Sequence, residues 1–157
     1  MADPVARPAL VHVAVVKEAL DVATISSRVA DPGAGAIATF AGAVRDHHAG
    51  KAVSHLEYEA YDSMAKATLA EVAGEASERW DLLGVAIEHR VGRLEIGEAS
   101  VVIAVATAHR GEAFAALRFL IDELKVRVPI WKRETGPDGT HWIEGPDLIA
   151  AAPEAAD

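Results

Sequence analysis

The sequence predicts an α+β protein in which an antiparallel or mixed sheet carries its helices largely on one face. Segments in which apolar and polar residues alternate, as in strands, are interspersed with two long segments in which apolar residues recur every three or four positions, as in helices. The length of 157 residues leaves room for one compact domain. We expect that domain at residues 10–149, with mobile segments at 1–9 and 150–157, because both ends contain few large apolar residues.

The first part of the chain predicts three strands and a short helix. Leu10–Val16 is an apolar run typical of a strand, and residues 24–29 are expected to form a short helix that ends before Pro32. Residues 36–41 form a second apolar strand. At residues 53–61 apolar and polar side chains alternate, which is the period of a half-buried strand.

A long helix is expected next, from an N-cap at Ser63 to about Trp80. Residues 85–91 alternate as a strand, and Gly97 marks a turn. Residues 100–106 are apolar on both faces, as expected for a central strand that is covered on both sides. The apolar stripe of the helix consists of Ala65, Leu69, Val72, Ala76 and Trp80.

The remaining part predicts a second helix and a hairpin. Pro129 must stop the helix within a few residues, because proline disfavours helical backbone in the residue before it. Residues 130–135 and 140–144 flank a Gly-Pro-Asp-Gly turn, and Trp131 and Trp142 can pair across this hairpin. The apolar stripe of the helix consists of Ala113, Phe114, Leu117, Leu120, Ile121 and Leu124.

Charge and composition limit the classes of ligand and location. The net charge of −9 argues against non-specific nucleic-acid binding, yet residues 110–133 contain six basic and three acidic side chains, which favours a small anionic ligand. The absence of cysteine excludes disulfides and thiolate nucleophiles. The apolar run at residues 8–16 is far shorter than the roughly 20 residues of a membrane span, so we expect a cytoplasmic protein without a membrane anchor.

Two loops are candidates for binding an anion. The His-Arg-Gly sequence at residues 109–111 lies between a predicted strand and a helix expected to begin near Glu112, where free N–H groups and the helix dipole favour negative charge. Arg110 would add a bidentate donor, although a surface ion pair is the alternative. Arg45, in the loop after Gly42, is a second candidate for a phosphate contact.

Two lysines are candidates for proton transfer or nucleophilic attack. Lys125 lies in the last turn of the second helix, and Lys132 follows beyond Pro129, so a reversal of the chain can bring both amines to one cleft. A lysine that is partly desolvated or close to other cations loses proton affinity and can act near neutral pH. Alternatively, Lys125 only complements the helix C-terminus and Lys132 is a solvated strand residue.

The histidines do not predict a metal site. His47 and His48 are adjacent, so their side chains point in different directions, and no H-x-x-x-H spacing occurs. His89, His109 and His141 are further candidates without such spacing. A glycine-rich nucleotide fingerprint is absent as well. We therefore expect neither a metal ion nor a nucleotide cofactor.

Three motifs, in this order and spacing, resemble the large, catalytic subunit of molybdopterin synthase: FAGAVRDH at residues 40–47, AHRGEAF at 108–114 and LKVRVPIWKRE at 124–134. The segments LEYEAY and HRVGRLEIGE extend the resemblance over residues 35–142. It implies an α/β hammerhead fold and a homodimer. Each protomer of the dimer would bind one small ubiquitin-like sulfur-carrier subunit, which gives a heterotetramer.

The resemblance also implies an activity. The C-terminal Gly-Gly thiocarboxylate of the carrier would enter a pocket of the large subunit, and its sulfur would pass to cyclic pyranopterin monophosphate. Two rounds would form the dithiolene of molybdopterin, with no thiol, metal or cofactor on the large subunit. The catalytic positions fall on Lys125 and Lys132. The substrate contacts of the family fall on Ala43, Val44, Arg45, His109, Arg110, Lys125, Lys132, Arg133 and Glu134.

Two other classes of protein remain open at this point. An adaptor for a ubiquitin-like protein would need the tail-binding groove but no reactive lysine, so substitution of Lys125 would leave it unaffected. A regulator that binds a pterin or nucleotide phosphate would need no thiocarboxylate partner. An assay with a thiocarboxylated carrier and the pyranopterin substrate discriminates both from a synthase.

Overall fold

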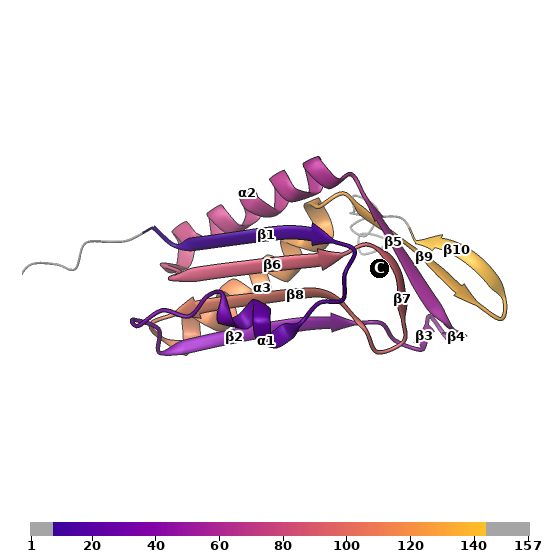
Figure 1. Cartoon of the computed structure of the whole chain (residues 1–157), viewed down its shortest axis with the longest axis horizontal. Coiled ribbons are helices and arrows are strands. Elements are labelled where there is room, and N and C mark those ends of the chain that lie inside the picture. The colour runs from indigo at the N-terminus through magenta and orange to yellow at the C-terminus, as the bar shows by residue number, and fades with distance from the viewer. Residues whose placement is uncertain (1–7, 144–157) are drawn as a thin grey trace, which may run out of the picture.

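The computed structural model describes residues 8–143, and its larger sheet is mixed. Strand β1 is parallel to β6, while β6 and β8, and β8 and β2, are antiparallel (Figure 1). Because β6 and β8 are the inner strands, they are buried over almost their whole length, as predicted for residues 100–106. In order across the sheet, the strands are β1 (Leu10–Val16), β6 (Gly84–Arg90), β8 (Ala99–Thr107) and β2 (Ala36–Ala43).

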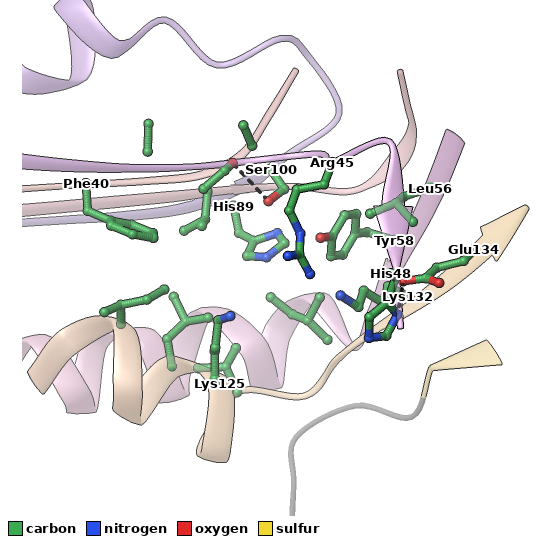
Figure 2. A pocket seen from close by; sticks show the side chains of 18 of the residues that line it. Phe40, Arg45, His48, Leu56, Tyr58, His89, Ser100, Lys125, Lys132 and Glu134 are labelled. Atoms are coloured by element: carbon green, nitrogen blue, oxygen red, sulfur yellow. Dashed lines mark hydrogen bonds and ion pairs between the residues drawn. The ribbon is translucent and has the colours of Figure 1, made fainter. Parts of the chain in front are cut away.

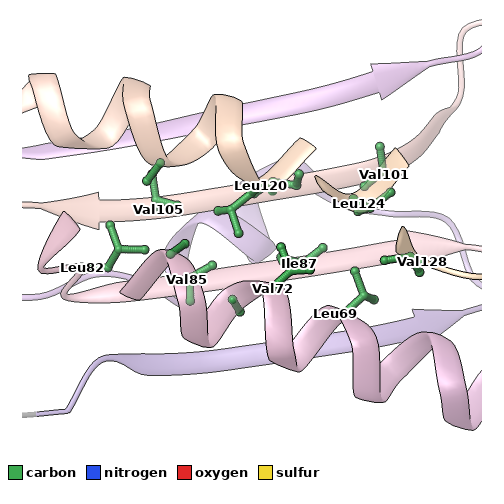
Figure 3. Close-up of a cluster of buried hydrophobic side chains, with 14 of the residues drawn as sticks. Leu69, Val72, Leu82, Val85, Ile87, Val101, Val105, Leu120, Leu124 and Val128 are labelled. Carbon is green, nitrogen blue, oxygen red and sulfur yellow. The ribbon is translucent and has the colours of Figure 1, made fainter. Parts of the chain in front are cut away.

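Two long helices, α2 (Asp62–Trp80) and α3 (Arg110–Arg127), cover one face of this sheet, and the short helix α1 (Val22–Ser27) covers the other. Figure 3 shows the main core between the two long helices and the strands. Full burial of each large aliphatic side chain stabilises the fold by about 1.5–3 kcal/mol. The side chains that interlock there include Leu69, Val72, Val85, Ile87, Val105, Leu120 and Leu124.

A second, antiparallel sheet lies at one end of the first (Figure 1). Its small core consists of Val44, Val53, Leu56 and Leu94. A two-residue ribbon, β3 (His47–His48) and β4 (Lys51–Ala52), adjoins it. In order, the strands of the second sheet are β10 (Gly139–Ile143), β9 (Ile130–Gly136), β5 (His55–Ala60) and β7 (Gly92–Glu95).

Most predicted elements are confirmed, with shifts at their ends. The helix that was expected at residues 24–29 begins two residues earlier, because the Asp21 carboxylate accepts hydrogen bonds from the backbone N–H groups of Ala23 and Thr24. The turn at Gly97 is confirmed by its φ of +88°. Strands β3, β4 and β7 were not predicted, since two to four residues are too few to show a period of two.

Two details of the predicted helices are wrong. Ser63 is not the N-cap of α2, which begins at Asp62 after Tyr61 and has no side-chain cap hydrogen bond. Phe114 is 64% exposed and does not belong to the buried stripe of α3. That stripe runs through Ala113, Ala116, Leu120 and Leu124, and Phe114 is rotated from it by about 100° around the helix axis.

The predicted tryptophan pair is also wrong, although the hairpin itself is confirmed. Gly136 pairs with Gly139, which sets Trp142 opposite Arg133. Trp131 instead packs edge-on against Tyr61, with ring centroids 5.0 Å apart. The two-residue loop fixes this register, so Trp131 cannot lie opposite Trp142.

The structure describes only part of the segments at the two ends of the predicted domain. Ala9 packs against the main core, whereas residues 1–7 and 144–157 lie outside the described residues, and with them most of the two segments expected to be mobile. Among residues 8–143, no helix is long and apolar enough to cross a membrane.

Candidate functional site

A cavity of about 580 Å³ opens between the two sheets and the C-terminal end of α3. Figure 2 shows strand side chains on one side and side chains of α3 on the other. The cavity therefore exists only where the second sheet meets the first. Its polar lining residues are Arg45, His47, His48, Tyr58, His89, Ser100, Lys125, Lys132 and Glu134.

Three cationic side chains from three elements project into this cavity. Arg45 follows the end of β2, Lys125 lies in the last turn of α3, and Lys132 lies on β9 (Figure 2). Val128 before Pro129 has extended backbone, so the helix ends there and the chain reverses into β9, as the sequence predicts. The expectation that Lys125 and Lys132 share one cleft is confirmed.

The two lysines differ in their surroundings. Lys125 is exposed, whereas Lys132 is half-buried. Burial lowers the pKa of Lys132 below its ordinary value, and the charges of Lys125 and Arg45 act in the same direction, while Glu134 opposes them. The half-buried amine therefore releases its proton more readily than an ordinary lysine does.

Arg45 reaches the cavity because of a local irregularity in β2. The pairing with β8 shifts between Gly42 and Ala43, which is a β-bulge at the end of the strand. A Cβ atom at Gly42 would lie 2.9 Å from Val101 Cγ1, so a side chain there would force the Val101 side chain or the backbone to shift. Glycine at position 42 thus permits β2 to lie close to β8 just before the chain leaves the strand toward Arg45.

Strand alternation divides the predicted contact residues into two groups. Lys132 and Glu134 line the cavity, while Arg133 between them lies on the opposite side of β9. There Arg133 donates a hydrogen bond to the Glu57 carboxylate, and its guanidinium lies 5.1 Å from the ring centroid of Trp142.

The same division occurs at the end of β2. Ala43 and Arg45 line the cavity, whereas Val44 is buried in the small core of the second sheet. Val44 therefore supports the site through packing and through its backbone, whose N–H donates to the Glu98 carbonyl over 3.0 Å.

Glu134 has a partner that the sequence did not predict. His48 Nδ1 lies 2.7 Å from Glu134 Oε1, which links the β3–β4 ribbon to β9 at the cavity (Figure 2). Ala49 and Gly50 form the turn of this ribbon, both with positive φ. His48 thus connects its loop to β9, the strand that also carries Lys132.

Sequence reasoning also missed a polar wall made by Tyr58, His89 and Ser100. The Tyr58 and His89 rings meet edge-on with centroids 5.1 Å apart, and Ser100 Oγ donates to the Gly42 carbonyl over 3.2 Å. Burial raises the pKa of Tyr58, while a hydrogen bond with Ser100 acts in the opposite direction. The available signal was His89 itself, a polar residue on a strand face whose other members, Val85 and Ile87, are apolar.

His109 and Arg110 do not reach this cavity within one chain. Both are exposed at the N-terminal end of α3, with His109 as the N-cap. Fifteen residues of helix separate Arg110 from Lys125, which corresponds to about 22 Å along the axis. The single chain thus presents two separate cationic sites, one at each end of α3.

The arrangement is suited to an anionic ligand that reacts under acid–base control. Arg45 can donate two hydrogen bonds to a phosphate or carboxylate. Lys132 can exchange a proton, and the amine of Lys125 is exposed. The uncharged wall of Tyr58, His89 and Ser100 can bind the neutral part of the same ligand.

Comparisons with known proteins agree on one family. The family model described as MoaE protein matches residues 15–127. The molybdopterin synthase catalytic subunit of Halalkalibacterium halodurans is 43% identical over 143 residues, which covers 91% of this chain and 92% of that protein. The subunit of the same name in Bacillus subtilis is 45% identical over 129 residues and covers 82% of each protein.

Solved structures share the fold. Molybdopterin synthase from Staphylococcus aureus has a TM-score of 0.79 at 36% identity, over 83% of this chain and 95% of that chain. A complex of subunits 1 and 2 of molybdopterin-converting factor from Helicobacter pylori has a TM-score of 0.69 at 19% identity, over 83% and 88%. On the family match and these relatives together, the chain belongs to the MoaE family.

Proposed function

We propose that this protein is the sulfur-transferring subunit of a molybdopterin synthase. It transfers sulfur from the C-terminal thiocarboxylate of a small ubiquitin-like carrier to cyclic pyranopterin monophosphate and so forms the dithiolene of molybdopterin. The observation that carries the proposal is the convergence of Arg45, Lys125 and Lys132 on one cavity in a chain that contains no thiol. Sulfur must therefore arrive on another molecule.

The three cations take different parts in the proposed reaction. Arg45 holds the substrate phosphate by charge-assisted hydrogen bonds. In each round the thiocarboxylate sulfur bonds to a substrate carbon and an oxygen substituent leaves that carbon, either as the phosphate oxygen when the cyclic phosphate opens or as water. Water then cleaves the acyl–sulfur bond, which leaves sulfur on the substrate and a carboxylate on the carrier. Lys125 lies beside the carrier's acyl carbon, and Lys132, with its lowered pKa, takes up and returns protons.

A second copy of the chain completes the proposed site. The residues expected to contact substrate include His109 and Arg110, which lie at the far end of α3 from Lys125. A homodimer that sets this helix end of one protomer beside the cavity of its partner would bring all the expected contacts together. The completed site would then hold the phosphate from both chains, with the free N–H groups of the α3 N-terminus adding to the attraction.

The carrier is the proposed protein partner, and a heterotetramer of two protomers with two carriers is the proposed assembly. The relevant relative is the Helicobacter pylori complex, in which two subunits of molybdopterin-converting factor are bound to each other. An extended Gly-Gly tail has no side chains and can enter a cavity between two sheets. A cytoplasmic location stays a prediction.

Reconstitution tests the proposal. The protein is mixed with a thiocarboxylated carrier and cyclic pyranopterin monophosphate, and the dithiolene product is measured. The matched control is the same carrier without its terminal Gly-Gly, which should bind more weakly in calorimetry and give no product. Tight binding of the carrier without any product would instead indicate an adaptor, and substrate binding without carrier binding would indicate a pterin-phosphate regulator.

A further inference from the structure

His89 presents a single, defined hydrogen-bonding group to the cavity. Its Nδ1 lies 2.9 Å from the Arg90 carbonyl oxygen. A carbonyl oxygen only accepts hydrogen bonds, so Nδ1 carries the hydrogen and Nε2 of the neutral ring carries a lone pair. Within residues 8–143, Nε2 has no hydrogen-bond partner.

The ring of His89 forms part of the cavity wall. His89 is only 4% exposed yet lines the cavity, and its ring lies against that of Tyr58 (Figure 2). Burial lowers the pKa of His89 to about 4, so the ring is uncharged at neutral pH. Nε2 presents its lone pair to the cavity, where an N–H group of a ligand can donate a hydrogen bond to it.

We propose that His89 is a specificity-determining residue that accepts a hydrogen bond from an N–H group on the neutral heterocycle of the substrate. This inference rests on the proposed function and extends it to the end of the substrate that carries no phosphate. Arg45 holds the phosphate end of the substrate, and His89 selects the heterocycle because its acceptor binds an N–H group but not a carbonyl oxygen.

The lining around His89 favours a ring system over the carrier's tail as the donor. Phe40, Leu56, Tyr58 and Val101 give the same cavity aromatic and aliphatic surface, and Tyr58 contacts the His89 ring. A fused heterocycle buries its flat faces against such surface, whereas a Gly-Gly tail has no side chains to bury. The tail also ends at a negative charge, which belongs beside the lysines.

Binding of neopterin monophosphate, a fluorescent pterin with a phosphate ester, tests the inference without any catalytic step. Fluorescence titration is carried out with the wild-type full-length protein and with His89→Asn and His89→Gln. Glutamine can place a carbonyl oxygen near the position of Nε2, whereas asparagine is too short and reaches only the position of Nδ1. We expect the Kd to rise about tenfold for His89→Asn and to stay within about threefold for His89→Gln.

Two controls accompany the titration. The first control is His12→Gln, which should leave the Kd unchanged. His12 lies outside the cavity, and its Nε2 is 2.9 Å from the Glu88 carboxylate. Thermal unfolding verifies that both His89 variants are folded. Calorimetry with the carrier measures tail binding separately, and we expect it to be equal for the wild type and both His89 variants.

The outcomes separate this inference from the proposed function. Folded His89→Asn that binds neopterin monophosphate as the wild type does would overturn the inference, and so would a wild type that does not bind this pterin. A loss of carrier binding without a loss of pterin binding would assign His89 to the tail and overturn it too. Failure of the proposed function is a different result: no dithiolene product from the wild type, whatever the pterin titration gives.

Discussion

Lys125 and Lys132 share a cavity but not an environment. Lys125 is exposed at the end of a helix, whereas Lys132 is half-buried on a strand, and its pKa is lowered mainly by that burial. A buried amine is the better proton carrier near neutral pH, and an accessible amine is better placed beside the tail of an incoming carrier. Substitutions of the two lysines should therefore differ in their effects.

Lys125→Ala should remove nearly all dithiolene formation while carrier binding stays intact, because the role proposed for this amine is at the reacting groups. Lys125→Arg should not restore activity, since a guanidinium keeps its charge but does not deprotonate at working pH. Single-turnover measurement of the product decides whether position 125 needs an amine that can lose its proton or only a positive charge. Turnover close to that of the wild type in Lys125→Arg would mean that positive charge alone suffices at this position.

Lys132→Met should strongly reduce product formation and yet stabilise the fold at pH 7, by about 1 kcal/mol. Burial disfavours the charged amine, so the folded state has the lower pKa and the unfolded state binds the proton more tightly. The cost of burying the charged amine lowers the unfolding free energy of the wild type at every pH below the folded-state pKa of Lys132. This cost disappears as the pH rises toward the ordinary pKa of lysine. Urea unfolding at pH 7 and pH 10 measures it, and a variant less stable than the wild type at pH 7 would contradict the assignment.

Helix α3 links the core to the site. Its buried face packs on the larger sheet through Ala113, Ala116, Leu120 and Leu124, and the last turn thereby holds Lys125 at the cavity. Pro129 then ends the helix and turns the chain into β9, which carries Lys132. The geometry of the two lysines thus depends on packing more than 10 Å away along the helix.

Two substitutions on α3 separate buried from exposed apolar positions. Leu120→Ala should cost about 2–5 kcal/mol of unfolding free energy, because it leaves a cavity in the main core. Phe114→Ala, at an exposed position of the same helix, should change it by about 0.5 kcal/mol or less. Chemical denaturation of both variants tests this, and a large loss for Phe114→Ala would show that another surface covers it.

At the scale of the whole molecule, the site depends on interfaces between parts. The cavity forms where two sheets meet, and the residues at the two ends of α3 can share one substrate only across two chains. A C2 dimer would form two equivalent composite sites. Both the chemistry and the assembly can therefore be tested by mixing inactive variants.

Arg110→Ala and Lys125→Ala should complement each other when coexpressed. Random pairing makes about half of the dimers mixed, and each mixed dimer has one intact site, so about a quarter of the wild-type activity should return. Lys125→Ala with Lys132→Ala is the matched control, because both residues lie in the cavity of one chain and no intact site forms. Absence of recovery in the first mixture would place Arg110 outside the site.

Stability of the whole molecule should fall in mild acid because of His89. Its folded pKa is about 4 and the ordinary value is 6.5, so the unfolded state binds the proton first as pH falls. The loss begins near pH 6.5, is complete below pH 4, and amounts to about 3 kcal/mol. Unfolding free energies measured from pH 7 to 4 should fall less for His89→Gln, and equal slopes would contradict the burial of a neutral ring.

The sequence by itself determined the order of the longer elements, the apolar strand at the centre of the sheet and the break at Pro129, because these depend on local periodicity and backbone restriction. It also placed Arg45, Lys125 and Lys132 in one site through the motifs that carry them. Only the tertiary structure decided that Arg133 and Val44 turn away, that His48 holds Glu134, and that His89 faces the cavity. The physical reason is that a side chain's partners are set by the register between strands and by the meeting of two sheets, which join residues far apart in the chain.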